Sequence, residues 1–159
     1  MRHLAALAIP SALFLLCACP ASAQDLSPEL QRMDQFIGTW NYDGMDGTAI
    51  CQRLADNIVR CNSDWTNADG DPVEAVFIWV HDPLTERYMT YRFYSSGYWD
   101  SGTGWFEDGT WVAIYDAQNG NKVKSTSTIT ADSWTYEWYR SVRGGPWEQT
   151  SEGSATRAR

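Results

Sequence analysis

A possible acid–base set stands in the aromatic segment at residues 134–142, where Glu137 and Arg140 lie among tyrosines and tryptophans. A carboxylate can accept and return a proton, and a guanidinium or phenol can stabilise charge that develops on a substrate. Such a combination would suit a hydrolase or an isomerase that works inside a cavity. No glycine-flanked serine elbow, phosphate-binding loop or dinucleotide-binding motif accompanies it. An enzyme that uses Glu137, Arg140 and tyrosines is therefore one hypothesis, and the sequence offers it no nucleophile and no cofactor.

Histidine chemistry depends on a single residue. The chain has two histidines, His3 and His81, and His3 falls in an apolar N-terminal segment. A mature chain that has lost this segment keeps His81 alone, so zinc sites that need two or three histidines cannot be built within one chain. The place of His81 at a strand end, just before Asp82 and Pro83, predicts a turn position with a hydrogen bond to Asp82. A general base at the mouth of the fold is the alternative.

An alternation of Asn67, Asp69 and Asp71 resembles the start of a calcium-binding loop. An EF-hand loop needs glycine at its sixth position and a bidentate glutamate at its twelfth. Pro72 and Ile78 stand at those positions here. The segment therefore predicts a solvated hairpin turn, and we expect no metal site.

Cys51 and Cys61 are expected to form a disulfide. They lie symmetrically about Asp56 in the turn-like sequence Ala55-Asp56-Asn57, so a hairpin centred there would place them opposite each other. Opposed Cβ atoms on neighbouring strands lie roughly 4.5–5.5 Å apart, close to the separation that a disulfide requires. The alternative is a redox-active or metal-binding pair, but neither a C-x-x-C spacing nor a histidine cluster supports it.

Residues 1–23 have the pattern of a secretory signal peptide. A short basic start precedes an apolar stretch at residues 4–17 that is too short to span a bilayer comfortably, and Ala21-Ser22-Ala23 fits a cleavage site. Cleavage there would leave residues 24–159 as one secreted or periplasmic domain, where a disulfide is expected to persist. The alternative is lipid anchoring at Cys19, because the sequence Leu16-Cys17-Ala18-Cys19 resembles a bacterial lipobox.

The composition is that of one acidic domain rich in aromatic residues. The 159 residues carry a formal net charge of −8 at pH 7, and no run of lysine or arginine offsets it. Nucleic acid and anionic membrane surfaces are therefore poor partners. Nine tryptophans, eight tyrosines and five phenylalanines give the chain a large aromatic surface to bury.

One short helix and a series of strands must position these side chains. Ser27 and Pro28 suit the start of a helix, and apolar residues at helical spacing predict that it continues to residue 37. After Gly38 the apolar residues alternate with period two, most clearly at 74–81, 86–95 and 134–142. Turn-forming residues divide the rest into about ten strands. Gly102-Thr103-Gly104 leads into no helix and predicts a tight turn or bulge instead of a phosphate cradle.

The short connections decide the expected topology. They leave no room for a crossover helix or a Greek-key return, so consecutive strands should be neighbours. A long antiparallel meander removes its exposed edges most simply by closing on itself. The sequence thus predicts an all-β fold, an antiparallel up-and-down β-barrel with a short N-terminal helix. A two-sheet β-sandwich is the alternative.

Several motifs resemble those of the lipocalin-like, or calycin, barrels. Phe36-Ile37-Gly38-Thr39-Trp40 is similar to their G-x-W opening, and the segments 81–88 and 104–109 resemble bacterial secreted lipocalin-like domains of unknown function. The likeness spans residues 30–157. It implies a barrel with a cavity for a small apolar molecule, with Trp40 closing one end beneath Arg157 or Arg140. Because some such barrels bind haem, it also implies His81 as a possible axial ligand.

Aromatic side chains on the strand faces are the main candidates for a binding site, either filling the barrel or lining a pocket. The candidate ligand-binding residues are Trp79, Tyr91, Arg92, Trp134, Trp138 and Arg140. Arg92 shares a strand face with Tyr88, Thr90 and Tyr94, and Tyr91 belongs to the opposite face. The pattern does not decide which face points inward. An inward Arg92 would need an anionic partner or a ligand carboxylate.

Three functions are compatible with the sequence. The favoured one is a secreted or periplasmic barrel that binds a small hydrophobic or aromatic molecule without catalysis. The second is the enzyme described above. The third is a structural or interaction protein of the cell envelope, whose exposed tryptophans would dock a partner.

Overall fold

The computed structural model describes residues 27–159, so the predicted signal peptide and the alternative lipid anchor at Cys19 lie outside the described residues. The chain opens with a short helix, α1 (Pro28–Arg32), followed by a turn of 3₁₀-helix at Met33–Phe36. The side chain of Ser27 caps α1 by accepting a hydrogen bond from the Leu30 amide at 3.4 Å. Within this part of the chain, no helix is long and apolar enough to cross a membrane.

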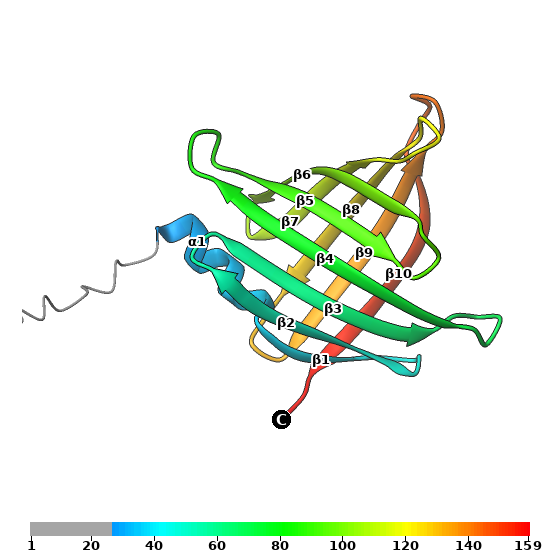
Figure 1. The fold of residues 1–159 in the computed structure, drawn as a ribbon, viewed down its shortest axis with the longest axis horizontal. Helices are drawn as coiled ribbons and strands as arrows, with labels where there is room; N and C mark the ends of the chain where they lie inside the picture. Colours follow the sequence, from blue (N-terminus) through cyan, green and yellow to red (C-terminus); the bar gives the residue numbers. More distant parts are fainter. Residues whose placement is uncertain (1–26) are drawn as a thin grey trace, which may run out of the picture.

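The rest of the described chain forms ten antiparallel strands that close into a barrel in sequence order, with β1 hydrogen-bonded to both β2 and β10 (Figure 1). The up-and-down barrel is confirmed and the sandwich alternative is wrong. The strands are β1 (Gly38–Tyr42), β2 (Gly47–Ala55), β3 (Ile58–Thr66), β4 (Pro72–Asp82), β5 (Arg87–Tyr94), β6 (Trp99–Glu107), β7 (Thr110–Asp116), β8 (Lys122–Ile129), β9 (Ser133–Ser141) and β10 (Glu148–Arg157).

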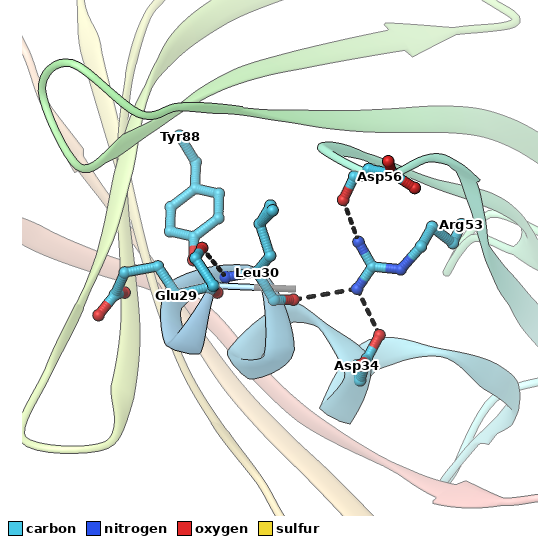
Figure 2. A network of polar contacts seen from close by, with 7 residues as sticks. Glu29, Leu30, Asp34, Arg53, Asp56 and Tyr88 are labelled. Carbon is cyan, nitrogen blue, oxygen red and sulfur yellow. Dashed lines mark hydrogen bonds and ion pairs between the residues drawn. The ribbon is translucent and has the colours of Figure 1, made fainter. Parts of the chain in front are cut away.

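The helical segment closes one end of the barrel, near the β2–β3 turn (Figure 1). Figure 2 shows how it is attached: Arg53 donates hydrogen bonds to the Leu30 and Asp56 carbonyls and pairs with the Asp34 carboxylate. On the other side of α1, the Tyr88 hydroxyl donates to the Glu29 carbonyl at 2.5 Å. Two barrel strands therefore hold the helix by polar contacts.

Trp40 and Arg157 join the first strand to the last. Trp40 is fully buried, and its indole Nε1 donates to the Phe36 carbonyl at 2.8 Å. The Arg157 guanidinium lies over the indole, 4.1 Å from the ring centroid, and donates to the carbonyls of Gln35, Ile37 and Ala131. The residue opposed to Trp40 is thus Arg157 and not Arg140.

The predicted disulfide is confirmed. Cys51 of β2 and Cys61 of β3 are paired in register and bonded to each other. Both side chains are buried in the barrel core.

The prediction of a turn or bulge at Gly102-Thr103-Gly104 is wrong. These residues lie inside β6, which pairs without a register shift with both β5 and β7. A Cβ atom on Gly104 would collide with the Trp111 ring. The glycine is therefore there to let a large aromatic side chain cross the barrel interior.

Candidate functional site

The barrel interior is hollow. A cavity of about 230 Å³ lies inside it, and eleven aromatic side chains make up most of its wall. Phe36, from the helical segment, lies at the closed end, whereas Met45, in the β1–β2 turn, marks the open end. The aromatic lining consists of Phe36, Tyr42, Trp65, Phe77, Trp79, Tyr94, Trp111, Tyr115, Trp134, Tyr136 and Trp138.

The rings of the wall contact one another edge to face. Phe36 contacts Trp111 and Trp134 at centroid distances of 5.8 and 5.4 Å, with interplanar angles of 80° and 84°. Trp79 meets Trp111 at 6.1 Å and 76°. Such edge-to-face pairs contribute about 0.5–1.5 kcal/mol each beyond their buried area. The rings thus keep their places around a space that they do not fill.

A buried ion pair lies behind the wall. Arg92 of β5 points into the barrel and makes a two-point contact with Asp100 of β6, including Nε to Oδ1 at 2.7 Å. Tyr98 donates its hydroxyl to the same carboxylate at 3.0 Å. Burial opposes the charged guanidinium, but its hydrogen bonds to Asp100 outweigh this effect and hold the pKa of Arg92 above its ordinary value.

The faces of the Arg92 guanidinium are also covered. Its central carbon lies 3.8 Å from the Tyr115 centroid and 4.6 Å from the Trp138 centroid, and both rings line the cavity. Asp100 is the anionic partner that an inward arginine requires. Arg92 consequently supports the cavity wall and does not line the cavity itself.

Hydroxyl-bearing residues and the acidic residue Glu152 supply the polar part of the lining. Ser125 and Ser127 of β8 lie among the rings, and the Tyr42 hydroxyl is hydrogen-bonded to Ser63. Burial raises the pKa of Tyr94 to about 12 and that of Tyr136 to about 12, so these phenols stay neutral through the physiological range. The Trp134 Nε1 atom is buried without a hydrogen-bond partner.

The predicted ligand-binding residues divide into three groups. Trp79, Trp134 and Trp138 line the cavity, and Arg92 lies behind its wall. The placement of Tyr91 is corrected, because it pairs with Ile78 and Ser101 on the outer face while its neighbours Thr90 and Arg92 are buried inside. Alternation along β5 therefore turns the Tyr91 side chain away from the cavity.

Arg140 is also corrected. It shares the inward parity of Trp134 and Trp138, but it stands near the end of β9, where it is exposed and lies outside the cavity lining.

The acid–base set does not assemble in the cavity. Glu137 points outward, accepting hydrogen bonds from Tyr139 at 2.6 Å and Thr126 at 3.1 Å. Those bonds, from Tyr139 first and Thr126 second, hold the pKa of Glu137 below its ordinary value. The hypothesis of an enzyme that uses Glu137 and Arg140 inside the barrel is therefore not supported by their positions.

His81 lies within β4 and not in a turn. It is buried, its ring centroid is 5.0 Å from that of Tyr88, and its Nε2 has no hydrogen-bond partner. Asp82 instead accepts hydrogen bonds from Leu84 and Thr85, so the predicted contact between His81 and Asp82 is corrected. His81 is the one histidine of residues 27–159 and does not line the cavity, so the residues present do not fit a haem.

The segment at residues 67–71 is the predicted hairpin turn. The Asn67 side-chain oxygen accepts hydrogen bonds from the amides of Asp69 and Asp71 at 3.0 and 2.8 Å. Across residues 27–159, no three histidine, cysteine or acidic side chains converge as metal ligands would.

Eight aromatic residues of the cavity are absent from the set of candidate ligand-binding residues: Phe36, Tyr42, Trp65, Phe77, Tyr94, Trp111, Tyr115 and Tyr136. The sequence predicts Phe36 as part of an amphipathic helix and does not indicate that this helix closes the barrel. Tyr42, Trp65 and Tyr94 stand at strand ends, where the period-two signal is weakest. All three lie at or next to the ends of odd-numbered strands. Those ends meet at one end of a meander barrel, so the sequence does indicate that these three side chains lie near one another.

No protein-family model matches the sequence, and no curated protein matches it. Among solved structures, the crystal structure of Rv2717c from M. tuberculosis is similar with a TM-score of 0.59 and 15% sequence identity, covering 85% of this chain and all of that one. A second, EF1p2_mFAP2b bound to DFHBI, reaches a TM-score of 0.45 at 12% identity, covering 82% and 99% of the two chains. The first similarity shows a shared barrel fold and no more.

Proposed function

We propose that this barrel binds a small hydrophobic or aromatic molecule and does not catalyse a reaction on it. The observation that carries the proposal is the hollow interior: eleven aromatic side chains surround about 230 Å³ of space. A dry apolar cavity of about 150 Å³ already accommodates benzene. A molecule of one or two rings therefore suits this cavity.

The residues that line the cavity are suited to recognise the shape of a ligand more than its charge. Most of the wall is apolar, and the hydroxyls of Ser125, Ser127 and Tyr136 can orient one polar group of the ligand. No lysine, arginine or histidine is among the lining residues that the structure describes.

We also propose that the protein works outside the cytoplasm, as a secreted or periplasmic member of the lipocalin-like barrels. The Cys51–Cys61 disulfide supports this location, because disulfides persist in oxidising compartments. Mass determination of the mature N-terminus tests it: a chain beginning at Gln24 is expected, and a diacylated Cys19 would establish a lipid anchor instead.

Calorimetric titration with indole and toluene tests the binding proposal, with native mass spectrometry of the purified protein to detect a retained ligand. Ser127→Leu would fill the cavity from β8 and should abolish binding. Thr128→Leu is the matched control, since the neighbouring residue is exposed on the outer face and should leave affinity unchanged. Thermal melts would verify that both variants are folded. Absence of any complex, or equal binding by Ser127→Leu, would overturn the proposal.

A further inference from the structure

Three of the aromatic rings that line the cavity lie at its open end. Tyr42 ends β1, Trp65 lies one residue before the end of β3, and Tyr94 ends β5. Trp65 meets Tyr42 and Tyr94 with centroid distances of 6.4 Å in both cases and interplanar angles of 78° and 85°. Rings at right angles form the walls of a box instead of a stack. Such boxes attract organic cations, because the face of each ring carries negative charge density.

Among the described residues that line the cavity, no lysine, arginine or histidine is present to pair with a carboxylate. The nearest guanidinium, that of Arg92, has Asp100 on its hydrogen-bonding edge and Tyr115 and Trp138 over its faces. It cannot reach a ligand without breaking a buried ion pair, which is a costly change. The same contacts show that rings of this wall already hold one planar cation.

The turns around the open end of the cavity, which we call the rim, add negative charge near the three rings. The five turns at the open end are residues 43–46, 67–71, 95–98, 117–121 and 142–147, and they contain four aspartates against one arginine. Two basic residues near these turns lie beside acidic ones: Lys122 forms an ion pair of 3.0 Å with Asp116, and Arg140 is paired in register with Glu148. A third, Lys124, lies over the rings of Tyr139 and Trp147. With a formal charge of −8 over the whole chain, the field attracts cations and repels anions.

We propose that the ligand of this cavity is an organic cation with an aromatic or compact apolar body. Its charged nitrogen lies among Tyr42, Trp65 and Tyr94, and its apolar part enters the barrel towards Phe36. This inference rests on the proposed binding function and specifies the chemical class of the ligand. It distinguishes this barrel from a carrier of fatty acids or other carboxylates.

Three probes of nearly equal shape test the charge preference: N-methylquinolinium, its neutral isostere 1-methylnaphthalene, and the anion 1-naphthoate. Quenching of tryptophan fluorescence and calorimetry would give each Kd at low ionic strength. We expect the cation to bind about tenfold more tightly than the neutral isostere, and the anion to bind most weakly.

Two pairs of variants separate charge recognition from general packing. Trp65→Leu keeps an apolar wall but removes a ring, so it should reduce the preference for the cation over the isostere. Trp99→Leu, on the exposed outer face, is the control.

The second pair of variants tests the charge of the rim. Asp46→Asn with Asp69→Asn at the rim should weaken cation binding about threefold at low salt, and the effect should shrink as salt is added. Asp108→Asn with Asp132→Asn removes the same charge at the helix end and should have a smaller effect.

The outcomes distinguish the two proposals. If neither 1-methylnaphthalene nor N-methylquinolinium binds, the proposed binding function fails and this inference fails with it. If the neutral isostere or the naphthoate binds as tightly as the cation, the binding function stands and the inference is overturned. A cation preference that survives Trp65→Leu would also overturn the assignment to the three-ring box.

Discussion

The Arg157 guanidinium lies 4.1 Å from the centroid of the Trp40 indole, so the last strand of the barrel packs a cation onto the first. The same guanidinium donates to three backbone carbonyls, two of them in the segment between the helix and β1. This one side chain thereby links the helical closure, the first strand and the β8–β9 turn.

Removing the Trp40 ring should destabilise the protein strongly. Trp40→Ala leaves a large void in a fully buried position, and such changes cost about 3–5 kcal/mol. Chemical denaturation would measure the loss. Trp99→Ala is the control, because Trp99 is 50% exposed on the outer face and its removal should cost far less. Equal stability of the Trp40 variant and the native protein would refute the closure role.

Removing one partner of the Arg92–Asp100 ion pair should lower the free energy of unfolding more than replacing both partners by apolar residues. Arg92→Met leaves the Asp100 carboxylate, which has no exposed surface, without its cation, and we expect a loss of about 3–5 kcal/mol in unfolding free energy. The double variant Arg92→Met with Asp100→Leu should recover a large part of that loss. A double-mutant cycle by denaturant titration checks this; additive losses would mean that the two groups do not depend on each other.

The helical segment should loosen when its polar contacts to the barrel are removed. Arg53→Ala deletes the contacts to Leu30, Asp34 and Asp56 drawn in Figure 2. We expect amide hydrogen exchange at residues 28–37 to accelerate about tenfold, because hydrogen bonds to a charged group contribute about 1.5–3 kcal/mol. Gln52→Ala, on the outer face of the same strand, is the matched control. Unchanged exchange in the Arg53 variant would show that the segment does not depend on Arg53 and is held by its other contacts, which include those of Tyr88 and Arg157.

The protein should lose stability in alkaline solution. Burial raises the pKa of Tyr94 and of Tyr136 to about 12, above the ordinary value of 10.0. Between those values the unfolded chain releases phenolic protons that the folded chain keeps, so the free energy of unfolding falls as pH rises from about 10 to 12. Denaturation curves across this range, with phenolate absorbance followed in parallel, would measure the fall. Tyr136→Phe should make it less steep, and an identical pH dependence in that variant would contradict the assignment to Tyr136.

Much of the fold is predictable from local sequence features. The capping residue Ser27, the period-two strands and the short turns together predict a short helix followed by a meander, and the symmetry of Cys51 and Cys61 about Asp56 predicts their bond. These features depend on backbone preferences and on neighbours within one hairpin. At Gly102 and Gly104 the local pattern favours a turn, but the cause of both glycines lies on the next strand. The backbone of Ile114 and Tyr115 leaves no room for a Cβ atom at residue 102, and the Trp111 ring leaves none at residue 104.

What the sequence determined by itself is an acidic, disulfide-linked antiparallel barrel with a large aromatic content, because alternation, turn chemistry and composition are properties of short segments. Only the tertiary structure decided that Arg92 faces inward and Tyr91 outward, that Asp100 neutralises the guanidinium, and that Glu137 and Arg140 stay out of the cavity. The physical reason is that period-two alternation specifies two faces without saying which one is inside. That choice, and the hollow that the aromatic rings leave open, arise only when ten strands and the helical segment close around a common interior.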